Sequence, residues 1–421
     1  MLDIEIIRKN PDWIAKKIKD RGYDVSVSEA LELDEAWRKL KFEDDALRSQ
    51  RNKLSKAVAE AKKAGKSADS LLKEAKEIPL KLKENEEKEK ELLRKRDSLI
   101  SSMPNLQMDD SPVGDETKNK VIHTKGTLPK IKNPKSHVEL GEALDILDIK
   151  RATKLSGEGF SVLKGTGARM QRALAAYMLD FHNTNGFVEV NPPQLVNQAT
   201  MFGTGQLPKF ADDLYRTQEG LYLIPTSEVP VTNLFSQETL VEKDLPKKFC
   251  AYTQCYRTEK GRRAGEEGLF RMHQFDKVEM VYLCREEDSE AFLEEMVSYA
   301  ERILENLGLP YRRVLLSTQD AGFASAKTYD LEVWSPSMKR WLEVSSCSNC
   351  MDFQARRMNT RYQAKDGSLK FIHTLNGSGL ALSRIPITIL ENFQQDDGSV
   401  IIPKVLHKYT GFKVIKPVSK K

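Results

Sequence analysis

Long hydrophobic runs are missing from this sequence. No stretch approaches the roughly 18 uninterrupted apolar residues of a membrane-spanning helix. The start of the chain carries charged side chains at Asp3, Glu5, Arg8 and Lys9, whereas a secretory signal peptide needs a long apolar core there. We therefore expect neither a membrane span nor a signal peptide, and no membrane partner.

Cysteine is also scarce. The chain has five cysteines: Cys250, Cys255, Cys284, Cys347 and Cys350. An odd number of scattered cysteines makes a poor disulfide framework and suits a reducing compartment, so we expect a cytoplasmic protein. Cys347 and Cys350 resemble half of a zinc site, but no second Cys pair or matching His pair accompanies them. The pattern therefore does not favour zinc.

Neither sign of charge dominates. The 67 basic residues nearly balance the 62 acidic ones, and the net charge is +5. Such a balance permits a nucleic-acid partner without requiring one. With 421 residues, of which 39% are hydrophobic, the chain is long enough for two or three domains with substantial cores.

Aromatic residues are nearly absent between Leu33 and Leu99, where Trp37 and Phe42 are the only two. Lys, Glu, Arg, Leu and Ala crowd this stretch, as they do in long helices. Apolar residues recur in it at seven-residue steps: Leu33, Leu40, Leu47, Leu54 and Ala61, then, after Gly65, Leu71, Ile78, Leu92 and Leu99. The repeat predicts two helices that fold back on each other as an antiparallel coiled-coil arm, over about residues 30–101.

Two features of this arm bear on its role. Its seam includes polar residues, namely Asp44, Arg51, Asn85, Glu89 and Arg96, and Pro79 should kink or interrupt the second helix, so we expect a flexible arm. Near the tip, lysines outnumber acidic residues: Lys53, Lys56, Lys62, Lys63, Lys66, Lys73 and Lys76. These lysines suit contacts with an RNA backbone. Taken alone, the arm fits a homotypic coiled coil or a solvated charged hairpin at least as well.

The sequence changes character after the arm. Residues 103–134 contain Pro, Asn, Asp, Gly and Lys with few large apolar residues, as a linker or irregular connection does. From about Ser136 onward, aromatic residues, Gly, Pro and short β-branched runs alternate with helical stretches, which is typical of an α+β domain. One apolar helix face runs from Met170 to Phe181 and closes at Gly186, and a strand is expected at residues 187–190.

Charged and aromatic residues concentrate between Cys255 and Val281. Arg257 and Glu259 lie two apart in a segment typical of a strand, so we expect them on the same face of a sheet. After a flexible basic loop over residues 260–268, a return strand is expected to place five side chains on one face: Arg271, His273, Phe275, Lys277 and Glu279. Such a platform suits a nucleotide triphosphate, with guanidinium groups for phosphate, a ring for the base and carboxylates for amino groups.

These segments resemble the motifs of class II aminoacyl-tRNA synthetases. The matching segments are residues 186–192 for motif 1, 257–279 for motif 2 and 374–384 for motif 3, with further signatures at Thr226–Glu228 and Glu343–Ser346. The run from Arg271 to Glu279 is similar to the seryl enzymes in particular. An antiparallel helical arm is also the tRNA-binding device of the seryl-tRNA synthetase family, so the resemblance covers essentially the whole chain.

The resemblance implies a fold, an activity and partners. The implied fold is α+β: an N-terminal tRNA-binding domain with the arm, residues 1–110, precedes a catalytic domain, residues 111–421, built on an antiparallel sheet flanked by helices. The implied activity is activation of L-serine by ATP to seryl-adenylate and pyrophosphate, followed by transfer of serine to the 3′-terminal adenosine of tRNA(Ser). A homodimer is implied as well, and tRNA(Sec) stays open as a further substrate.

The resemblance also assigns site residues. For ATP they are Arg257, Thr258, Glu259, Arg271, Phe275, Glu343, Val344, Ser345, Ser346 and Arg384, of which Glu343 and Ser346 resemble the pair that coordinates Mg²⁺. For serine they are Thr226, Ser227, Glu228, Glu279, Asn376 and Ser378. Arg257, Glu279 and Arg384 are the implied catalytic residues. Arg257 is expected on the α-phosphate, Glu259 on the adenine amino group and Phe275 against the adenine ring.

The implied chemistry needs no nucleophile from the protein, because positioning and charge stabilisation suffice for both steps. We therefore expect a structural role for His273. Two other functions compete with this hypothesis. One is a synthetase-like RNA-binding or regulatory protein that has lost catalysis, and the other is an enzyme that loads a small amino acid onto a carrier protein. Serine-dependent pyrophosphate exchange separates the first from an active synthetase, and charging with tRNA as the only acceptor separates the second.

Overall fold

The computed structural model of the chain describes residues 1–259 and 268–418. Most of the basic loop expected at residues 260–268 therefore lies outside the described residues. The chain divides into two compact units, one over Leu2–Pro104 and one over Asn105–Lys421.

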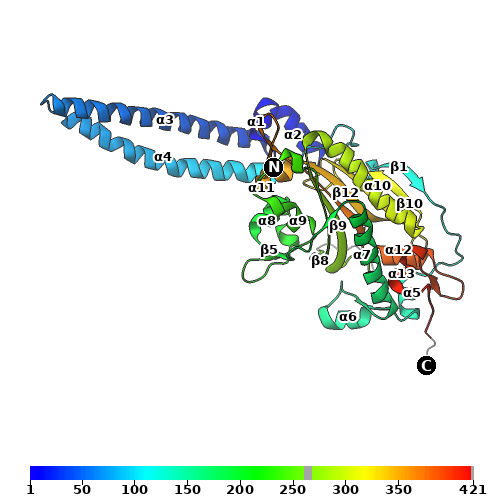
Figure 1. The fold of residues 1–421 in the computed structure, drawn as a ribbon. Helices are drawn as coiled ribbons and strands as arrows, with labels where there is room; N and C mark the ends of the chain where they lie inside the picture. The colour runs from blue at the N-terminus through cyan, green and yellow to red at the C-terminus, as the bar shows by residue number, and fades with distance from the viewer. Residues whose placement is uncertain (260–267, 419–421) are drawn as a thin grey trace. The chain divides into compact units, whose positions relative to one another are not determined.

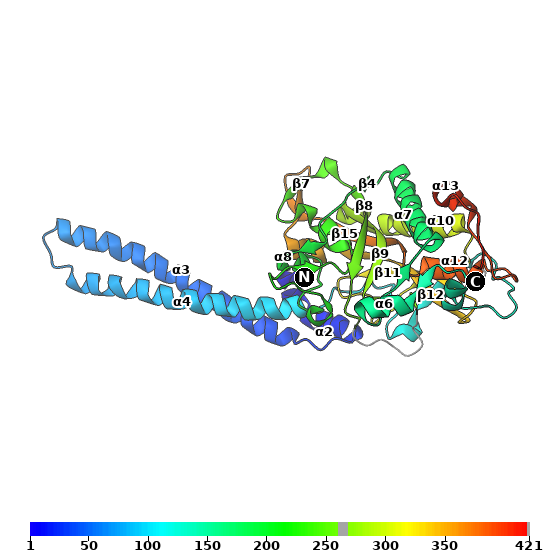
Figure 2. The same ribbon diagram turned by 90° about the horizontal axis from the view of Figure 1, so that it is seen from below.

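The first unit is helical. Its α-helices are α1 (Ile4–Lys9), α2 (Pro11–Asp20), α3 (Val27–Lys63) and α4 (Asp69–Ser102). The side chain of Ser26 caps α3 by accepting a hydrogen bond from the backbone N–H of Glu29 at 3.1 Å. Gly65, with φ of +67°, lies in the turn after α3, and α4 returns alongside as an antiparallel hairpin (Figure 1 and Figure 2). The predicted two-helix arm is confirmed, and α3 alone spans roughly 55 Å at 1.5 Å per residue.

Polar residues of the seam pair across the two helices. The Asn85 amide donates a hydrogen bond to Asp44 at 2.7 Å, and Arg96 lies 3.1 Å from the buried carboxylate of Asp34. Arg51 differs from the others, because its side chain is exposed. Since these pairs meet only at one alignment of α3 and α4, they oppose sliding of one helix along the other.

Helix α4 continues through Pro79. Of the two effects predicted for this residue, an interruption is therefore wrong. Pro79 is exposed, so the carbonyl that loses its N–H partner there can bond water instead. Its neighbour Ile78 is buried, and this packing helps to hold the helix together across the proline.

An eight-stranded sheet forms the centre of the second unit (Figure 1). Its strands, in spatial order, are β1 (Lys120–Lys125), β10 (Tyr311–Leu315), β11 (Lys327–Ser335), β12 (Arg340–Met351), β15 (His373–Ala381), β9 (Gln274–Cys284), β8 (Lys247–Tyr256) and β4 (Val188–Glu189). Neighbouring strands are antiparallel, except for the parallel pair of β4 and β8. The predicted antiparallel sheet is confirmed.

Strand β1 corrects one expectation, because it lies within the segment predicted to be a linker. It pairs with β10 on one side only and forms an edge of the sheet. Val121 and Ile122 in it remain exposed. An edge strand needs no continuous apolar pattern, so composition alone does not reveal it.

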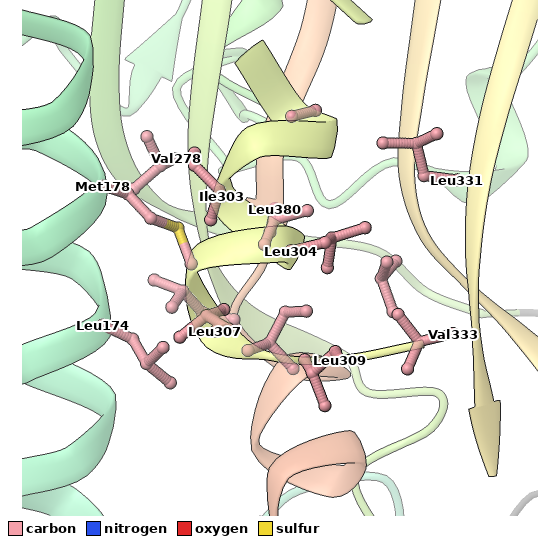
Figure 3. Packing of buried hydrophobic residues seen from close by; sticks show 14 of the residues in the cluster. Leu174, Met178, Val278, Ile303, Leu304, Leu307, Leu309, Leu331, Val333 and Leu380 are labelled. Atoms are coloured by element: carbon pink, nitrogen blue, oxygen red, sulfur yellow. The ribbon is translucent and has the colours of Figure 1, made fainter. Parts of the chain in front are cut away.

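Two long helices cover one face of the sheet. Helices α7 (Thr166–Thr184) and α10 (Ser289–Leu307) share a hydrophobic core with the central strands (Figure 3). In β9, the side chains of Val278, Met280 and Tyr282 point into this core. Because side chains alternate along a strand, the intervening residues of β9 point to the opposite face. On that face Val281 and Leu283 pack into a second, smaller hydrophobic core, whereas Phe275, Lys277 and Glu279 line a cavity.

Shorter elements complete the second unit. Its further α-helices are α5 (His137–Ala143), α6 (Ile149–Ser156), α8 (Gln198–Gly203), α9 (Glu228–Thr232), α11 (Phe353–Met358), α12 (Ile385–Asn392) and α13 (His407–Thr410). Its small sheets are β2 (Leu147–Asp148) with β3 (Val162–Leu163), β5 (Leu195–Val196) with β6 (Tyr222–Leu223), β16 (Val400–Ile401) with β17 (Val414–Ile415), and β7 (Thr239–Val241) with β13 (Arg361–Gln363) and β14 (Leu369–Phe371). Across residues 1–259 and 268–418, no helix combines the length and apolar character needed to cross a membrane.

Candidate active site

A cavity of about 630 Å³ lies against the polar face of the sheet, away from α7 and α10. The predicted site residues that line it are Thr226, Glu228, Arg257, Glu259, Arg271, Phe275, Glu279, Glu343, Ser346, Asn376, Ser378 and Arg384. They come from strands β9, β12 and β15 and from the segments beside them. Side chains that lie up to 158 residues apart in the sequence, from Thr226 to Arg384, therefore meet around one cavity.

Four predicted contact residues do not line this cavity: Ser227, Thr258, Val344 and Ser345. Ser227 is completely buried at the start of α9. The Thr258 hydroxyl instead donates a hydrogen bond to the carbonyl of Asp212 at 3.5 Å. Each of the four stands next to a residue that does line the cavity, so the matched segments contribute only some of their side chains.

A β-bulge in β12 decides which residues of the Glu343–Ser346 segment reach the cavity. Glu332 of β11 pairs with Glu343, whereas the preceding Leu331 pairs with Ser345, so Val344 is an extra residue in the ladder. Its side chain packs into the hydrophobic core. The bulge allows Glu343 and Ser346 to face the same cavity although they are three residues apart, which regular alternation does not permit.

Arg257 and Glu259 do not lie in a strand, although the sequence predicted them on one face of a strand. Strand β8 ends at Tyr256, and Glu259 has a left-handed backbone with φ of +46°. Arg271 likewise precedes β9, which begins at Gln274. A turn rather than a strand therefore brings Glu259 to Arg271, whose Nε lies 2.9 Å from the Glu259 carboxylate.

Arg257 lies beside Phe275, one of the aromatic residues that line the cavity. Its guanidinium carbon is 5.1 Å from the centre of the Phe275 ring, and its Nε donates a hydrogen bond to the Pro225 carbonyl at 3.3 Å. The Arg257 backbone N–H donates to the His273 carbonyl at 2.9 Å, which extends the pairing of β8 and β9 by one bond. His273 itself does not line the cavity, and its Nδ1 lies 3.0 Å from the Arg257 carbonyl oxygen.

Arg384 forms a second cationic point, fixed by Glu343. Its Nη1 lies 3.1 Å from the Glu343 carboxylate and donates a hydrogen bond to the Glu343 backbone carbonyl at 2.8 Å. The charge of Arg384 holds the pKa of Glu343 below its ordinary value, and Glu343 in turn raises the pKa of Arg384. Both groups are therefore charged near neutral pH.

Two buried carboxylates meet in the same cavity. The Asn376 amide donates to Glu228 and to Glu279, each at 3.2 Å, and Lys277 Nζ lies 2.5 Å from the other oxygen of Glu279. Burial, and then the negative charge of Glu279, raise the pKa of Glu228 to about 7. Because one lysine balances only one of the two carboxylates, the arrangement suits an additional cation such as an ammonium group.

Comparison with known proteins places the chain in a family. A family model described as "Seryl-tRNA synthetase N-terminal domain" matches residues 1–107, and one described as "tRNA synthetase class II core domain (G, H, P, S and T)" matches residues 209–393. The serine–tRNA ligase of Caldicellulosiruptor saccharolyticus is 48% identical, over 99% of this chain and 100% of its own length. That of Staphylococcus haemolyticus is 48% identical over 100% of both chains.

The chain belongs to the seryl-tRNA synthetase family. Solved structures agree with this membership. The seryl-tRNA synthetase of Pyrococcus horikoshii, complexed with ATP, has a TM-score of 0.95 at 37% identity, and the match covers 100% of both chains. The cytoplasmic serine–tRNA ligase of Naegleria fowleri, in complex with AMP, has a TM-score of 0.90 at 30% identity and covers 100% of this chain and 99% of that one. The predicted family and class II fold are confirmed.

Some residues that line the cavity were not predicted from the sequence. Lys277 lines the cavity and pairs with Glu279, and the signal that could have found it is its place two residues before Glu279 on the same strand face. The segment Thr204, Gly205 and Gln206 also lines the cavity. It carries no charged residue and no recognised motif, and only tertiary contacts bring it there.

The cysteines are all free and buried. Cys350 lines the cavity, whereas Cys347 packs in the hydrophobic core, so the two do not face one common site. Over the described part of the chain, no group of three or more His, Cys, Asp or Glu side chains is arranged to hold a metal ion.

Proposed function

We propose that this enzyme is a serine–tRNA ligase, which activates L-serine with ATP and transfers it to the 3′-terminal adenosine of tRNA(Ser). One observation carries the proposal: three arginines and an aromatic ring share a cavity with a buried pair of carboxylates. The arginines and the ring suit an adenylate, and the carboxylates suit the ammonium group of an amino acid. Because Arg257, Glu279 and Arg384 all line the cavity, nothing in it favours the inactive alternative.

At the nucleotide, we assign Arg257 to the α-phosphate and Phe275 to the adenine ring. The contact between Arg257 and the ring of Phe275 supports this assignment, because it places a phosphate-binding group beside a stacking surface. Arg271 and Arg384 are assigned to the outer phosphates. Each is already oriented by a carboxylate, Glu259 and Glu343 respectively, so little side-chain freedom is lost on binding. Glu259 is also assigned to the adenine amino group.

At the amino acid, we assign Glu279 and Glu228 to the ammonium and hydroxyl groups of serine. Thr226, Asn376 and Ser378 line the same cavity and complete the polar surroundings. A site built to hydrogen-bond a hydroxyl leaves buried groups unpaired when alanine binds, which can cost on the order of 10⁴-fold in specificity.

The two chemical steps need only binding and charge stabilisation by these residues. A carboxylate oxygen of serine attacks the α-phosphorus in line, and the bond from that phosphorus to the bridging oxygen of the β-phosphate breaks, which releases pyrophosphate. A ribose hydroxyl of the terminal adenosine then attacks the serine carbonyl carbon. AMP leaves with the electrons of the acyl–phosphate bond, and the hydroxyl proton ends on solvent or phosphate. The arginines stabilise the charge that develops on phosphate in both steps.

Glu343 and Ser346 are the residues that would hold Mg²⁺ together with ATP. They fit this ion, because a carboxylate and a hydroxyl from one strand line the same cavity and Mg²⁺ prefers hard oxygen ligands. When bound with the nucleotide, the ion would neutralise part of the negative charge on the outer phosphates.

The arm is assigned to tRNA. The seven lysines near its tip are all exposed: Lys53, Lys56, Lys62, Lys63, Lys66, Lys73 and Lys76. Exposed lysines can neutralise backbone phosphates, which supports binding of residues 1–110 to tRNA and leaves catalysis to residues 111–421.

Two further assignments belong to the same proposal: a homodimer and a cytoplasmic location. The segment that resembles motif 1 supports the dimer. It includes β4 at an edge of the main sheet, where Val188 is 59% exposed, and such an edge can pair with a second copy.

Serine-dependent exchange of labelled pyrophosphate into ATP tests the proposal. We expect exchange with L-serine, no exchange without an amino acid, and charging of tRNA(Ser) with no other acceptor present. A folded protein without exchange would favour the RNA-binding alternative. Exchange without tRNA charging would favour loading of a carrier protein instead.

The affinity for serine should depend on pH. Because the pKa of Glu228 is raised to about 7, this carboxyl is mostly neutral below that pH and mostly charged above it. An ammonium ligand binds the charged form better, so the KM for serine should rise by about tenfold between pH 8 and pH 6. Steady-state exchange kinetics over this range measure the effect. Glu228→Gln should flatten the profile, and an unchanged profile in that variant would contradict the assignment.

A further inference from the structure

Gln354 lies behind the pair of carboxylates and does not itself line the cavity. It is the second residue of helix α11, and its side chain is 1% exposed. Its amide nitrogen donates to the Glu228 carboxylate at 2.7 Å and to the Thr204 carbonyl at 3.2 Å. Its amide oxygen accepts from the Thr374 hydroxyl at 2.6 Å. Two acceptors on one side and a hydroxyl donor on the other fix the orientation of the amide.

The partners of Gln354 lie in three separate segments that border the cavity. Glu228 begins α9, and Thr204 begins the segment that lines the cavity between α8 and α9. Thr374 lies in β15 two residues before Asn376, whose amide bonds both carboxylates. One buried side chain therefore connects Glu228 to the neighbouring wall and to the strand that carries Asn376.

The same helix holds the neighbouring wall at two further points. Arg357, three residues after Gln354 and on the same face of α11, donates to the Phe202 carbonyl at 2.7 Å and to the Leu207 carbonyl at 2.6 Å. These carbonyls flank the lining residues 204–206. The Arg357 hydrogen bonds attach helix α11 to the segment around residues 204–206. They therefore hold the backbone of Gln354 at the position from which its side chain reaches Glu228.

Glu228 depends on this support for its orientation. In residues 1–259 and 268–418, two side-chain amides donate to its carboxylate, Gln354 at 2.7 Å and Asn376 at 3.2 Å. Each amide has a second acceptor, Glu279 for Asn376 and the Thr204 carbonyl for Gln354, but the bond from Gln354 to Glu228 is the shorter of the two. A buried carboxylate without such a donor either rotates or takes up a proton.

We propose that Gln354 is a positioning residue for serine, which holds the Glu228 carboxylate in place and in its charged form. The inference rests on the proposed role of Glu228 in binding serine and adds a residue outside the cavity. The charged groups that face Glu228 are Glu279, Lys277 and Arg257. Burial and Glu279 raise the pKa of Glu228, while Lys277, the Gln354 hydrogen bond and Arg257 lower it. Loss of Gln354 should therefore raise this pKa further.

Gln354→Met in the full-length enzyme tests the proposal, since Met has a similar shape and no amide. We expect the KM for serine at pH 7.5 to rise about tenfold or more, because a hydrogen bond to a charged group is lost, while the KM for ATP stays within about twofold. The rise of the serine KM at low pH should also begin at a higher pH than in the unsubstituted enzyme. A merely structural role would not move that profile selectively.

Two further variants complete the test. Gln354→Glu keeps an acceptor for Thr374 but places a second acid next to Glu228, so it should move the profile in the same direction even if Gln354→Met folds poorly. Arg356→Gln changes the same helix at a residue that pairs with Asp352, and serves as the matched control with an unchanged serine KM.

The outcomes are distinguishable. Unchanged serine KM and pH profile in a folded Gln354 variant, or an equal rise of the KM values for serine and ATP, would overturn the positioning role while leaving the proposed function intact. Absence of serine-dependent exchange in the unsubstituted enzyme would instead overturn the proposed function, and the positioning role with it.

Discussion

Deletion of residues 45–84 is expected to lower tRNA charging by at least about 10³-fold while serine-dependent pyrophosphate exchange stays within about twofold. The deletion removes all seven exposed lysines near the tip of the arm, and no residue of the cavity. Asp44 and Asn85 are hydrogen-bonded at 2.7 Å, so a short Gly-Ser linker can join the cut ends across the hairpin. Parallel exchange and charging assays measure the two activities.

The shortened arm keeps its base, including the contact between Asp34 and Arg96. This design avoids the loss of a buried ion pair, which a deletion of the entire arm would cause. As a graded control, Lys53→Gln together with Lys73→Gln should lower charging partially and reduce its sensitivity to salt, because fewer phosphates are neutralised. Equal losses of exchange and charging in the deletion would contradict the assignment of tRNA binding to the arm.

Glu279→Gln is expected to lower kcat/KM for serine by about 10³-fold, with the KM for ATP changed by less than about threefold. The substitution preserves shape but removes the charge that faces Lys277 at 2.5 Å and the proposed serine ammonium. Removal of one partner from a buried charge pair is costly because the other charge stays buried without compensation. Initial rates of exchange at varied serine and varied ATP separate the two effects.

The matched control is Glu286→Gln, which makes the same chemical change at a surface glutamate that pairs with Lys370 at 3.0 Å. An exposed pair of this kind contributes little, so both KM values should stay unchanged. A Glu279→Gln enzyme that kept its serine kinetics and lost affinity for ATP would show that this carboxylate serves the nucleotide.

The arm could be predicted from the sequence because its signal is local. A seven-residue repeat that extends over many turns defines both the helix and its buried side, but it does not show that Asp44 and Asn85 lie opposite each other. The effect of Pro79 on the second helix was less predictable. It depends on the packing of Ile78 and on whether water reaches the carbonyl that loses its N–H partner at the proline.

The site could be predicted as a set of segments but not as a set of side chains. Alternation along β9 correctly placed Phe275 and Glu279 on one face. Alternation did not apply at Glu259, where the backbone turns through a left-handed conformation. Val344, which the resemblance assigned to ATP, is directed into the core by a bulge. Neither a bulge nor a left-handed turn at a non-glycine residue leaves a pattern in a single sequence.

Residues that act from behind the cavity were beyond sequence reasoning altogether. Gln354 lies in a short helix outside the matched motifs, and its three partners are at least 20 residues away in the chain, at Thr204, Glu228 and Thr374. Such a role is defined by tertiary contacts alone, because an amide can bond to almost any polar group.

A crystal structure with a non-hydrolysable seryl-adenylate analogue, in which a sulfamate replaces the phosphate, tests the central claim most directly. We expect the serine ammonium within hydrogen-bonding distance of Glu279, Arg257 in contact with the sulfamate, and the adenine stacked on Phe275. An analogue bound outside this cavity, or bound in it with the serine end away from Glu228 and Glu279, would contradict the account.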